Sequence, residues 1–153
     1  MLTDEVELLR QVPIFARIKP TKLKLLAFAS ERRKYQAGQD VCRQGEAGDA
    51  AYVVLSGTAD IMVTSAAGEM KVAEVGIHSI VGEIAVLCGG VRTASVRATS
   101  PVEVLRITKE HFLELVSEFP EVALEIMRTL AERLAHTTAD LTAARNANHE
   151  LVE

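Results

Sequence analysis

Hydrophobic and polar positions follow different periods along the chain, and the changes of period divide it into three parts. Over residues 1–31, apolar residues such as Leu23 and Leu26 recur at helical spacing. Over residues 32–107, short runs rich in Val, Ile, Tyr and Thr alternate with glycine-containing turns, which is typical of short antiparallel strands. Over residues 108–153 the helical period returns. The pattern predicts a single α+β domain, mainly β: an antiparallel β-barrel or jelly roll flanked by N-terminal helices and a long C-terminal helix.

Turn and cap residues sharpen these boundaries. Four glycines are the expected corners of the β region, because glycine takes positive φ without steric cost: Gly45, Gly48, Gly57 and Gly68. Pro13 to Phe15 reads as a turn that docks Phe15 on the core, and Pro20 suits the start of a helix. Thr108 is a plausible N-cap, and Pro120 ends one helix and opens the next. That last helix has no breaker over about 30 residues, so it would be a rod of roughly 45 Å.

The C-terminal helix also carries an apolar stripe in steps of three and four. Its a and d positions are Met127, Leu130, Leu134, Thr137, Leu141, Ala144, Asn148 and Leu151. Asn148 at an a position is a device that fixes a two-stranded parallel register, and Asp140 can pair with Arg145 of a partner helix. We therefore expect a homodimer through this helix. The alternative is that the stripe packs on the chain's own barrel.

Composition places the chain among soluble globular proteins. It has 153 residues, is 48% hydrophobic and 25% charged, and has a net charge of −4, so no general nucleic-acid-binding surface is indicated. Cys42 and Cys88 stand outside any CxxC pattern, so we expect free, small hydrophobic side chains and a reducing, cytoplasmic location. The acidic N-terminus does not resemble a signal peptide. No apolar run approaches the roughly 20 residues that span a bilayer, so we expect no membrane partner.

The segment Val81–Ala98, VGEIAVLCGGVRTASVRA, carries the candidate chemistry. Gly82 allows a close backbone approach, and residues 83–87 can form a helical turn whose free N–H groups suit a phosphate. Arg92, at the start of the next predicted strand, can bind two phosphate oxygens with its guanidinium. Glu83 beside an anion site is unfavourable unless it accepts a hydrogen bond, for example from a sugar hydroxyl.

This segment resembles the phosphate-binding cassette of cyclic-nucleotide-binding domains, whose pattern runs roughly F-G-E-x-A-L, a short loop, then R-[AST]-A-[ST]-V. The stretch QGEAGDAAYVVLSG, residues 44–57, is similar to the strand-turn stretch that precedes the cassette. The resemblance covers almost the whole chain. It implies a regulatory sensor domain that is not an enzyme, needs no cofactor, and passes ligand binding to an unknown downstream protein by moving its C-terminal helix.

The resemblance also implies a role for each matching residue. Glu83 would accept from the ribose 2′-hydroxyl, and Arg92 would pair with the cyclic phosphate. Backbone N–H groups near Ala85 and Thr93 would complete the phosphate shell, and Gly82 would allow the close approach. The ligand-binding set that follows from the cassette is Gly82, Glu83, Ile84, Ala85, Arg92, Thr93 and Ala94.

The C-terminal helix resembles the dimer helix of the catabolite activator protein group. The match places Arg133, Thr137 and Thr138 at the bound base, with Thr138 reaching in from the partner subunit. The two threonines favour cAMP, whereas a hydroxyl at Thr93 leaves cGMP as the alternative. That group continues into a helix-turn-helix, but this sequence ends at Glu153, so we expect no DNA binding.

Some positions depart from the family pattern, and two other functions compete with the sensor. Before the cassette, His78, Ser79 and Val81 replace a frequent Gly, Asp and Phe, and His78 reads as a loop residue. A metal-dependent barrel enzyme would need clustered ligands, but the histidines are scattered at positions 78, 111, 136 and 149. The second alternative is a ligand-independent, dimeric protein-interaction module with a degenerate nucleotide-binding fold.

Overall fold

The computed structural model describes the backbone of residues 2–152 and the side chains of residues 5–136, 138, 139 and 142. Helices precede and follow a region of strands, as the pattern predicts. The elements are α1 (Leu2–Arg10), the 3₁₀ turn η1 (Pro13–Phe15), α2 (Pro20–Ala29), β1 (Glu31–Tyr35), β2 (Asp40–Cys42), β3 (Ala50–Ser56), β4 (Ala59–Ser65), β5 (Gly68–Val75), β6 (Ile80–Val81), α3 (Glu83–Cys88), β7 (Ser95–Ala98), β8 (Val102–Thr108), α4 (Lys109–Glu118) and α5 (Pro120–Val152).

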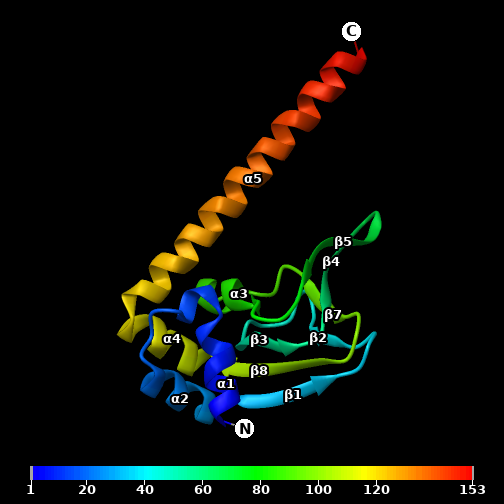
Figure 1. Ribbon diagram of the computed structural model, residues 1–153. Helices are drawn as coiled ribbons and strands as arrows, with labels where there is room; N and C mark the ends of the chain where they lie inside the picture. Colours follow the sequence, from blue (N-terminus) through cyan, green and yellow to red (C-terminus); the bar gives the residue numbers. More distant parts are fainter. Residues whose placement is uncertain (1, 153) are drawn as a thin grey trace.

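The strands form two antiparallel sheets of four strands each, in the jelly-roll arrangement that was expected (Figure 1). The strand order is β1-β8-β3-β6 in one sheet and β2-β7-β4-β5 in the other. β4 and β5 form a long hairpin that projects beyond the sheets on the same side as α5 (Figure 1). The prediction of a mainly β fold with flanking helices is confirmed.

Strands β3 and β8 lie between two hydrophobic clusters, which explains the unbroken apolar run in β3. Ala51 and Val53 face the helices, where they pair with Ile107 and Leu105 of β8. The alternate residues of β3, including Tyr52, face the other sheet. A strand that is covered on both faces needs apolar residues at every position. The two clusters therefore divide the core into a helical layer and an inter-sheet layer.

The helix starts behave as their capping residues predict. Pro20 opens α2, and the Thr108 hydroxyl accepts the backbone N–H of His111 at the start of α4. Phe15 of η1 is fully buried in the helical cluster. Contacts of η1 with α1 and α5, and of α1 with β3, bring η1 and these two helices onto the same face of the β3–β8 sheet (Figure 1).

Among the described side chains of α5, those near its start pack on the domain. Val122 and Ile126 are buried in the helical cluster, and Leu130 is half-buried against it. From Ala131 to His136 every side chain is exposed, and Leu134 is 68% exposed. Leu130, predicted as a seam residue, thus packs on its own domain. The side chains of the other seam residues from Thr137 onward lie outside the described set. No helix in the described part of the chain is long and apolar enough to cross a membrane.

Two sequence expectations need correction. Gly45, Gly57 and Gly68 have positive φ, as corners should, but Gly48 does not. Instead, a Cβ at Gly48 would lie 2.5 Å from the carbonyl carbon of Ala85, so Gly48 is required by close packing against α3. The other correction concerns the thiols, which are both free: Cys42 is a buried hydrophobic residue as expected, but Cys88 is exposed.

Candidate functional site

The segment 81–98 forms a tight structure between β6 and β7. Gly82 has φ of 80° and Gly89 has φ of 65°, so both ends of α3 need the left-handed conformation that glycine adopts freely. No side chain caps the first turn of α3, so its N–H groups remain available. Arg92 was expected at the start of a strand, but β7 begins three residues later, at Ser95. Arg92 therefore sits in the connecting loop, because its backbone bonds to the β2–β3 loop and not to a strand.

The guanidinium of Arg92 is buried and held from one side. Arg92 is 4% exposed. Its Nη2 donates to the carbonyl oxygen of Ala50 at 2.8 Å and to Oδ1 of Asp49 at 3.3 Å. The guanidinium carbon lies 5.4 Å from the ring centroid of Tyr52, within the range of a cation–π contact. These contacts fix the side chain in one orientation, which is a precondition for bidentate anion binding.

The other terminal nitrogen of Arg92, Nη1, is buried without a hydrogen-bond partner. A buried donor left unpaired costs about 1–3 kcal/mol, so such atoms are rare outside functional sites. Nη1 faces Gly82: a Cβ added there would lie 2.4 Å from it. The expected close approach at Gly82 is therefore an approach to Arg92, and any larger residue at this position would displace the guanidinium.

Glu83 is the second buried charge of the segment, at 7% exposure. Burial raises the pKa of its carboxyl group above the usual 4.5, while its own backbone N–H and Arg133 act in the opposite direction. Oε1 of Glu83 lies 3.9 Å from Nη1 of Arg133 on α5, whose side chain is 59% exposed. Such a long, half-solvated pair compensates the buried carboxylate only weakly. Glu83 is thus an acceptor held at an energetic cost.

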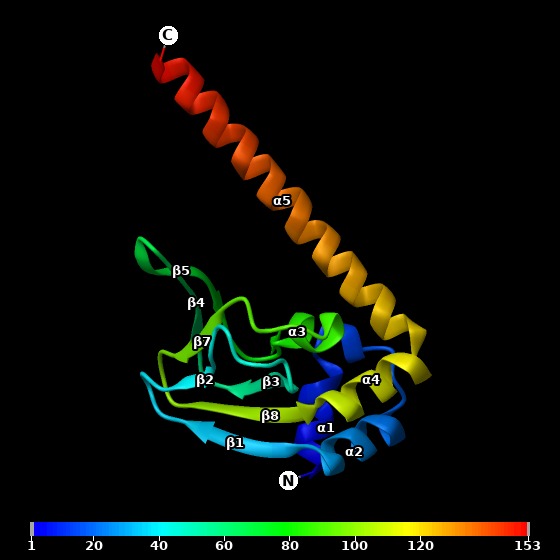
Figure 2. The same ribbon diagram turned by 180° about the vertical axis from the view of Figure 1, so that it is seen from behind.

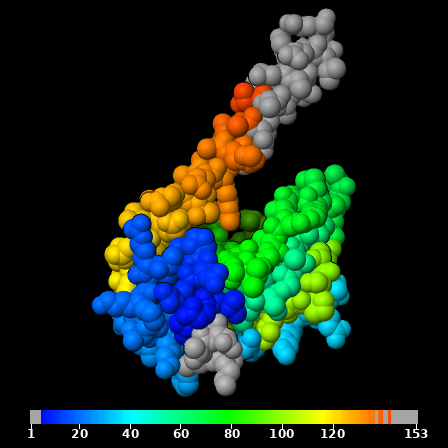
Figure 3. Space-filling model, viewed as in Figure 1, coloured from blue at the N-terminus to red at the C-terminus, as the bar shows by residue number. Residues whose placement is uncertain are grey.

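These groups line a cavity of about 470 Å³, between the segment 81–98, the β4–β5 hairpin and α5. Figure 3 shows the hollow between α5, in orange, and the hairpin, in green. Eight of the ten residues predicted from the sequence line it: Gly82, Glu83, Ile84, Ala85, Arg92, Thr93, Ala94 and Arg133. Thr138 is exposed and does not line it, and the side chain of Thr137 lies outside the described residues.

The apolar wall of this cavity was largely missed by sequence reasoning. It is formed by residues of five strands, β2, β4, β5, β6 and β7, among them Cys42, Ile61, Val75, Ile80 and Val96. Ile61 and Val96 are direct partners across β4 and β7, although they are far apart in sequence. The alternation of apolar residues marks each of them as inward-facing, but only the strand pairing shows that they face the same cavity.

A smaller cavity of about 220 Å³ shares Glu83 and Arg133 with the larger one and lies between η1 and α5. His78 is part of its lining. The residue is in a loop, as expected, with φ of 72°, a left-handed conformation that is uncommon for a residue other than glycine. Glycine is frequent at this position in the family that the sequence resembles, which fits this backbone geometry.

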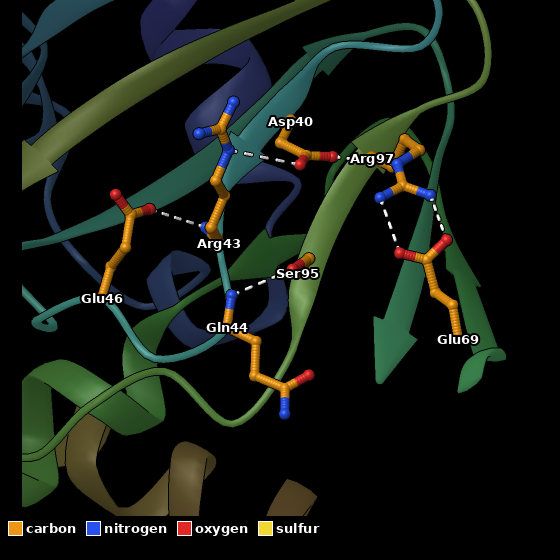
Figure 4. Close-up of polar contacts among 7 residues, drawn as sticks. All are labelled: Asp40, Arg43, Gln44, Glu46, Glu69, Ser95 and Arg97. Atoms are coloured by element: carbon orange, nitrogen blue, oxygen red, sulfur yellow. Dashed lines mark hydrogen bonds and ion pairs between the residues drawn. The ribbon is translucent and has the colours of Figure 1, made fainter. Parts of the chain in front are cut away.

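Hydrogen bonds from the β2–β3 loop hold the cassette in place (Figure 4). The backbone N–H of Gln44 donates to Oγ of Ser95 at 2.9 Å, and the Gln44 side chain bonds both backbone groups of Thr64. The backbones of Gly45 and Glu46 bond the carbonyl and N–H of Arg92 at 2.9 and 2.8 Å. The loop therefore ties the Arg92 backbone to the hairpin strand β4.

A network of charges at the sheet edge holds the neighbouring strands together. Arg97 of β7 forms two hydrogen bonds with the carboxylate of Glu69, on β5, and one of 3.0 Å with Oδ1 of Asp40, on β2 (Figure 4). The planar guanidinium suits this bidentate geometry. Arg97 points away from the cavity, so Arg92 and Arg97, five residues apart, have distinct roles.

The chain is similar in sequence to parts of longer proteins, including a cyclic AMP receptor protein and a protein of the NTE family. The chain is 32% identical to the cyclic AMP receptor protein of Thermus thermophilus over 84% of its own length and 60% of the relative's. It is 34% identical to an uncharacterised NTE family protein of Mycobacterium tuberculosis over 94% of its own length and 24% of the relative's. The chain thus spans less than two thirds of either relative.

Solved structures share the fold. The catabolite activator protein of Thermus thermophilus superposes with a TM-score of 0.76 and 32% identity, over 84% of this chain and 61% of that one. The regulatory subunit of a cAMP-independent protein kinase A from Trypanosoma brucei has a TM-score of 0.75 and 26% identity, over 84% and 46%. The family model of the cyclic nucleotide-binding domain matches residues 32–119, more than half of the chain. The chain therefore belongs to the family of cyclic nucleotide-binding regulatory domains.

Proposed function

We propose that this chain binds a cyclic nucleotide monophosphate, with cAMP favoured, in the cavity of about 470 Å³. The observation that carries the proposal is the buried Nη1 of Arg92, which lacks a partner and faces the cavity wall at Gly82. A cyclic phosphate would supply an acceptor for it and a counter-charge for the guanidinium. The first-turn N–H groups of α3 would add further donors.

The remaining parts of the nucleotide have matching groups. Glu83 would accept from the ribose 2′-hydroxyl, which would add a hydrogen bond to its buried carboxylate. The apolar wall around Ile61 and Val96 suits the sugar and the base. Arg133, on α5, lines the side of the cavity where the base would lie. Thr137 would contact the base from the same subunit, and Thr138 would reach it from a second copy.

Calorimetric titration with cAMP, cGMP and 5′-AMP tests this assignment. We expect micromolar or tighter binding of a cyclic form and little binding of 5′-AMP, whose phosphate carries an additional charge and no ring. The preferred base follows from the same titration, with Thr93 as the residue that would favour cGMP. Absence of binding to both cyclic forms would refute the proposal.

A ligand-independent interaction module is the second candidate function. The Trypanosoma brucei relative of similar fold is described as cAMP-independent, so this fold does not by itself guarantee a response to cAMP. In that case neither cyclic nucleotide would raise the melting temperature. A ligand that binds only the folded state must raise it, by an amount that grows with the ratio of free ligand to Kd.

The output of binding is a movement of α5 toward the cavity. This proposal is supported by the exposure of residues 131–136, by the hollow beside them (Figure 3), and by Arg133, which faces Glu83 across the cavity. Ligand shifts the helix position only as far as its affinities for the two positions differ. A spin-label distance between exposed Cys88 and Ala135→Cys should shorten when nucleotide is added, and an unchanged distance would rule the movement out.

The dimer proposal rests on an exposed apolar stripe of α5 that begins beside its anchoring residues and continues beyond them. Leu124, Met127 and Leu134 are 59%, 62% and 68% exposed, and Ala131 lies between the last two at heptad spacing. With Leu130 turned inward, the seam runs through these residues. Leu134→Glu would place two carboxylates in this seam, so we expect the dimer mass in light scattering to fall to that of a monomer. Arg128→Glu, on the same helix, is the matched control; a monomeric wild-type chain would contradict the proposal.

A further inference from the structure

A second surface of the molecule combines exposed apolar side chains with a concentration of positive charge. On α2, Leu23 and Leu26 are buried in the core, while Leu25 and Phe28 point the other way and are 63% and 81% exposed. They are three residues apart on a helix, so they lie side by side. A phenylalanine exposed to this extent is unusual on a soluble surface and marks an interaction site when it lies within a patch.

The charge around this pair is segregated from the rest of the chain. Residues 17–34 contain seven Lys or Arg and one acidic residue, a net charge of +6. The other ten basic and twenty acidic residues give −10. In the sequence, the basic residues lie on both sides of the apolar pair: Arg17, Lys19, Lys22 and Lys24 before it, and Arg32, Arg33 and Lys34 after it.

Several of these basic residues form no ion pair with another described residue. Lys22 pairs with Glu118, Arg32 with Glu5 and Glu103, and Arg33 with Glu31. Among the described residues, no ion pair includes Arg17, Lys19, Lys24 or Lys34. Lys24 lies on the same outward face of α2 as Leu25 and Phe28. An apolar centre with free cations around it is complementary to an anionic lipid surface, which accepts both.

We propose that the α2–β1 face, defined by Lys24, Leu25, Phe28 and Lys34, docks the protein on a bilayer that contains anionic phospholipid. α2 and β1 follow the same edge of the molecule in both views, and the free end of α5 extends away from that edge (Figures 1 and 2). Docking there leaves the cavity and α5 accessible. It does not depend on nucleotide binding. The expectation of no membrane partner considered only segments that span a bilayer, and this proposal concerns docking on its surface.

Vesicle co-sedimentation of the full chain tests the proposal. We expect binding to phosphatidylcholine vesicles that contain phosphatidylglycerol, and none to phosphatidylcholine alone. Phe28→Ser and Lys24→Glu should each lower the partition coefficient at least about fivefold, because each basic residue near such a surface contributes about that factor and the aromatic ring inserts into the interface. High salt should weaken binding, since it screens the surface charge.

Two matched variants distinguish binding through the α2–β1 face from nonspecific binding through any exposed charge or apolar side chain. Met70→Ser removes an apolar side chain of similar exposure on β5, and Arg128→Glu makes the same charge change on α5. Both should bind anionic vesicles as the wild type does. The proposal is overturned if the wild type does not bind, if the controls lose binding equally, or if Phe28→Ser and Lys24→Glu retain it. It is also overturned if Phe28→Ser changes only the mass of the chain in solution, because the face would then contact a second copy.

Discussion

Replacement of Arg92 by alanine should weaken cyclic nucleotide binding by roughly 30-fold to several thousand-fold. The guanidinium is buried, and its Nη2 is held by Ala50 and Asp49, so its free Nη1 is already oriented toward a ligand. Removal of the charge leaves the phosphate without its counter-charge, which costs about 2–5 kcal/mol. Calorimetric titration of the variant with the ligand that binds the wild type measures the loss directly.

The unfolding free energy separates this effect from misfolding. Arg92→Ala removes the hydrogen bonds of Nη2 to Ala50 and Asp49 together with the unpaired Nη1, so the unfolding free energy of the variant is measured beside its affinity. Arg43→Ala is the matched control, because Arg43 is 71% exposed and lies outside the cavity. Wild-type affinity in Arg92→Ala, or an equal loss in Arg43→Ala, would show that the phosphate is bound elsewhere.

Replacement of Glu83 by glutamine should change affinity and stability in opposite directions. The neutral amide keeps the shape and an acceptor oxygen, but it exchanges a charge-assisted hydrogen bond to the ribose for an ordinary one. We expect affinity to fall about tenfold. The ligand-free variant should be more stable than the wild type at neutral pH, because it no longer buries a weakly compensated carboxylate.

The pH dependence of unfolding identifies the cause of this gain. Burial raises the pKa of Glu83 in the folded state above 4.5, so the folded chain binds this proton more tightly than the unfolded chain. The unfolding free energy contributed by Glu83 therefore falls as pH rises from the unfolded pKa through the folded pKa, and stays low above it. The stability difference between Glu83→Gln and wild type should grow over that interval in denaturant titrations. A difference that does not vary with pH would assign the gain to packing.

The cassette could be located in the sequence because its residues lie close together along the chain. Gly82, Glu83 and Arg92 lie within eleven residues of each other, so one short segment carries the pattern, although Asp49 and Ala50 hold the Arg92 side chain in place. The same is true of the Thr108 cap and the proline starts of α2 and α5. At these positions the local preferences of the residues agree with the fold. Structure can be predicted from sequence where such agreement holds.

The parts that the sequence did not predict depend on contacts between distant segments. Gly48 resembles a turn glycine, but its requirement comes from Ala85, which lies far along the chain. The cavity wall needs the register of β4 against β7, and Leu130 needs the position of the core relative to α5. Periodicity gives the face of each element, whereas the partner of that face is set by tertiary packing.

The division of the core into two clusters has a calorimetric consequence for the cassette. Val86 of α3 belongs to the helical cluster, while Val81 and Val96, on either side of it, belong to the inter-sheet cluster. A displacement of α3 by a ligand thus alters the hydration of apolar surface in a layer that the ligand does not touch. The heat-capacity change of binding would then be larger than the burial of the nucleotide's own apolar surface accounts for. The excess would report how much apolar surface of the helical layer changes its hydration when the ligand binds.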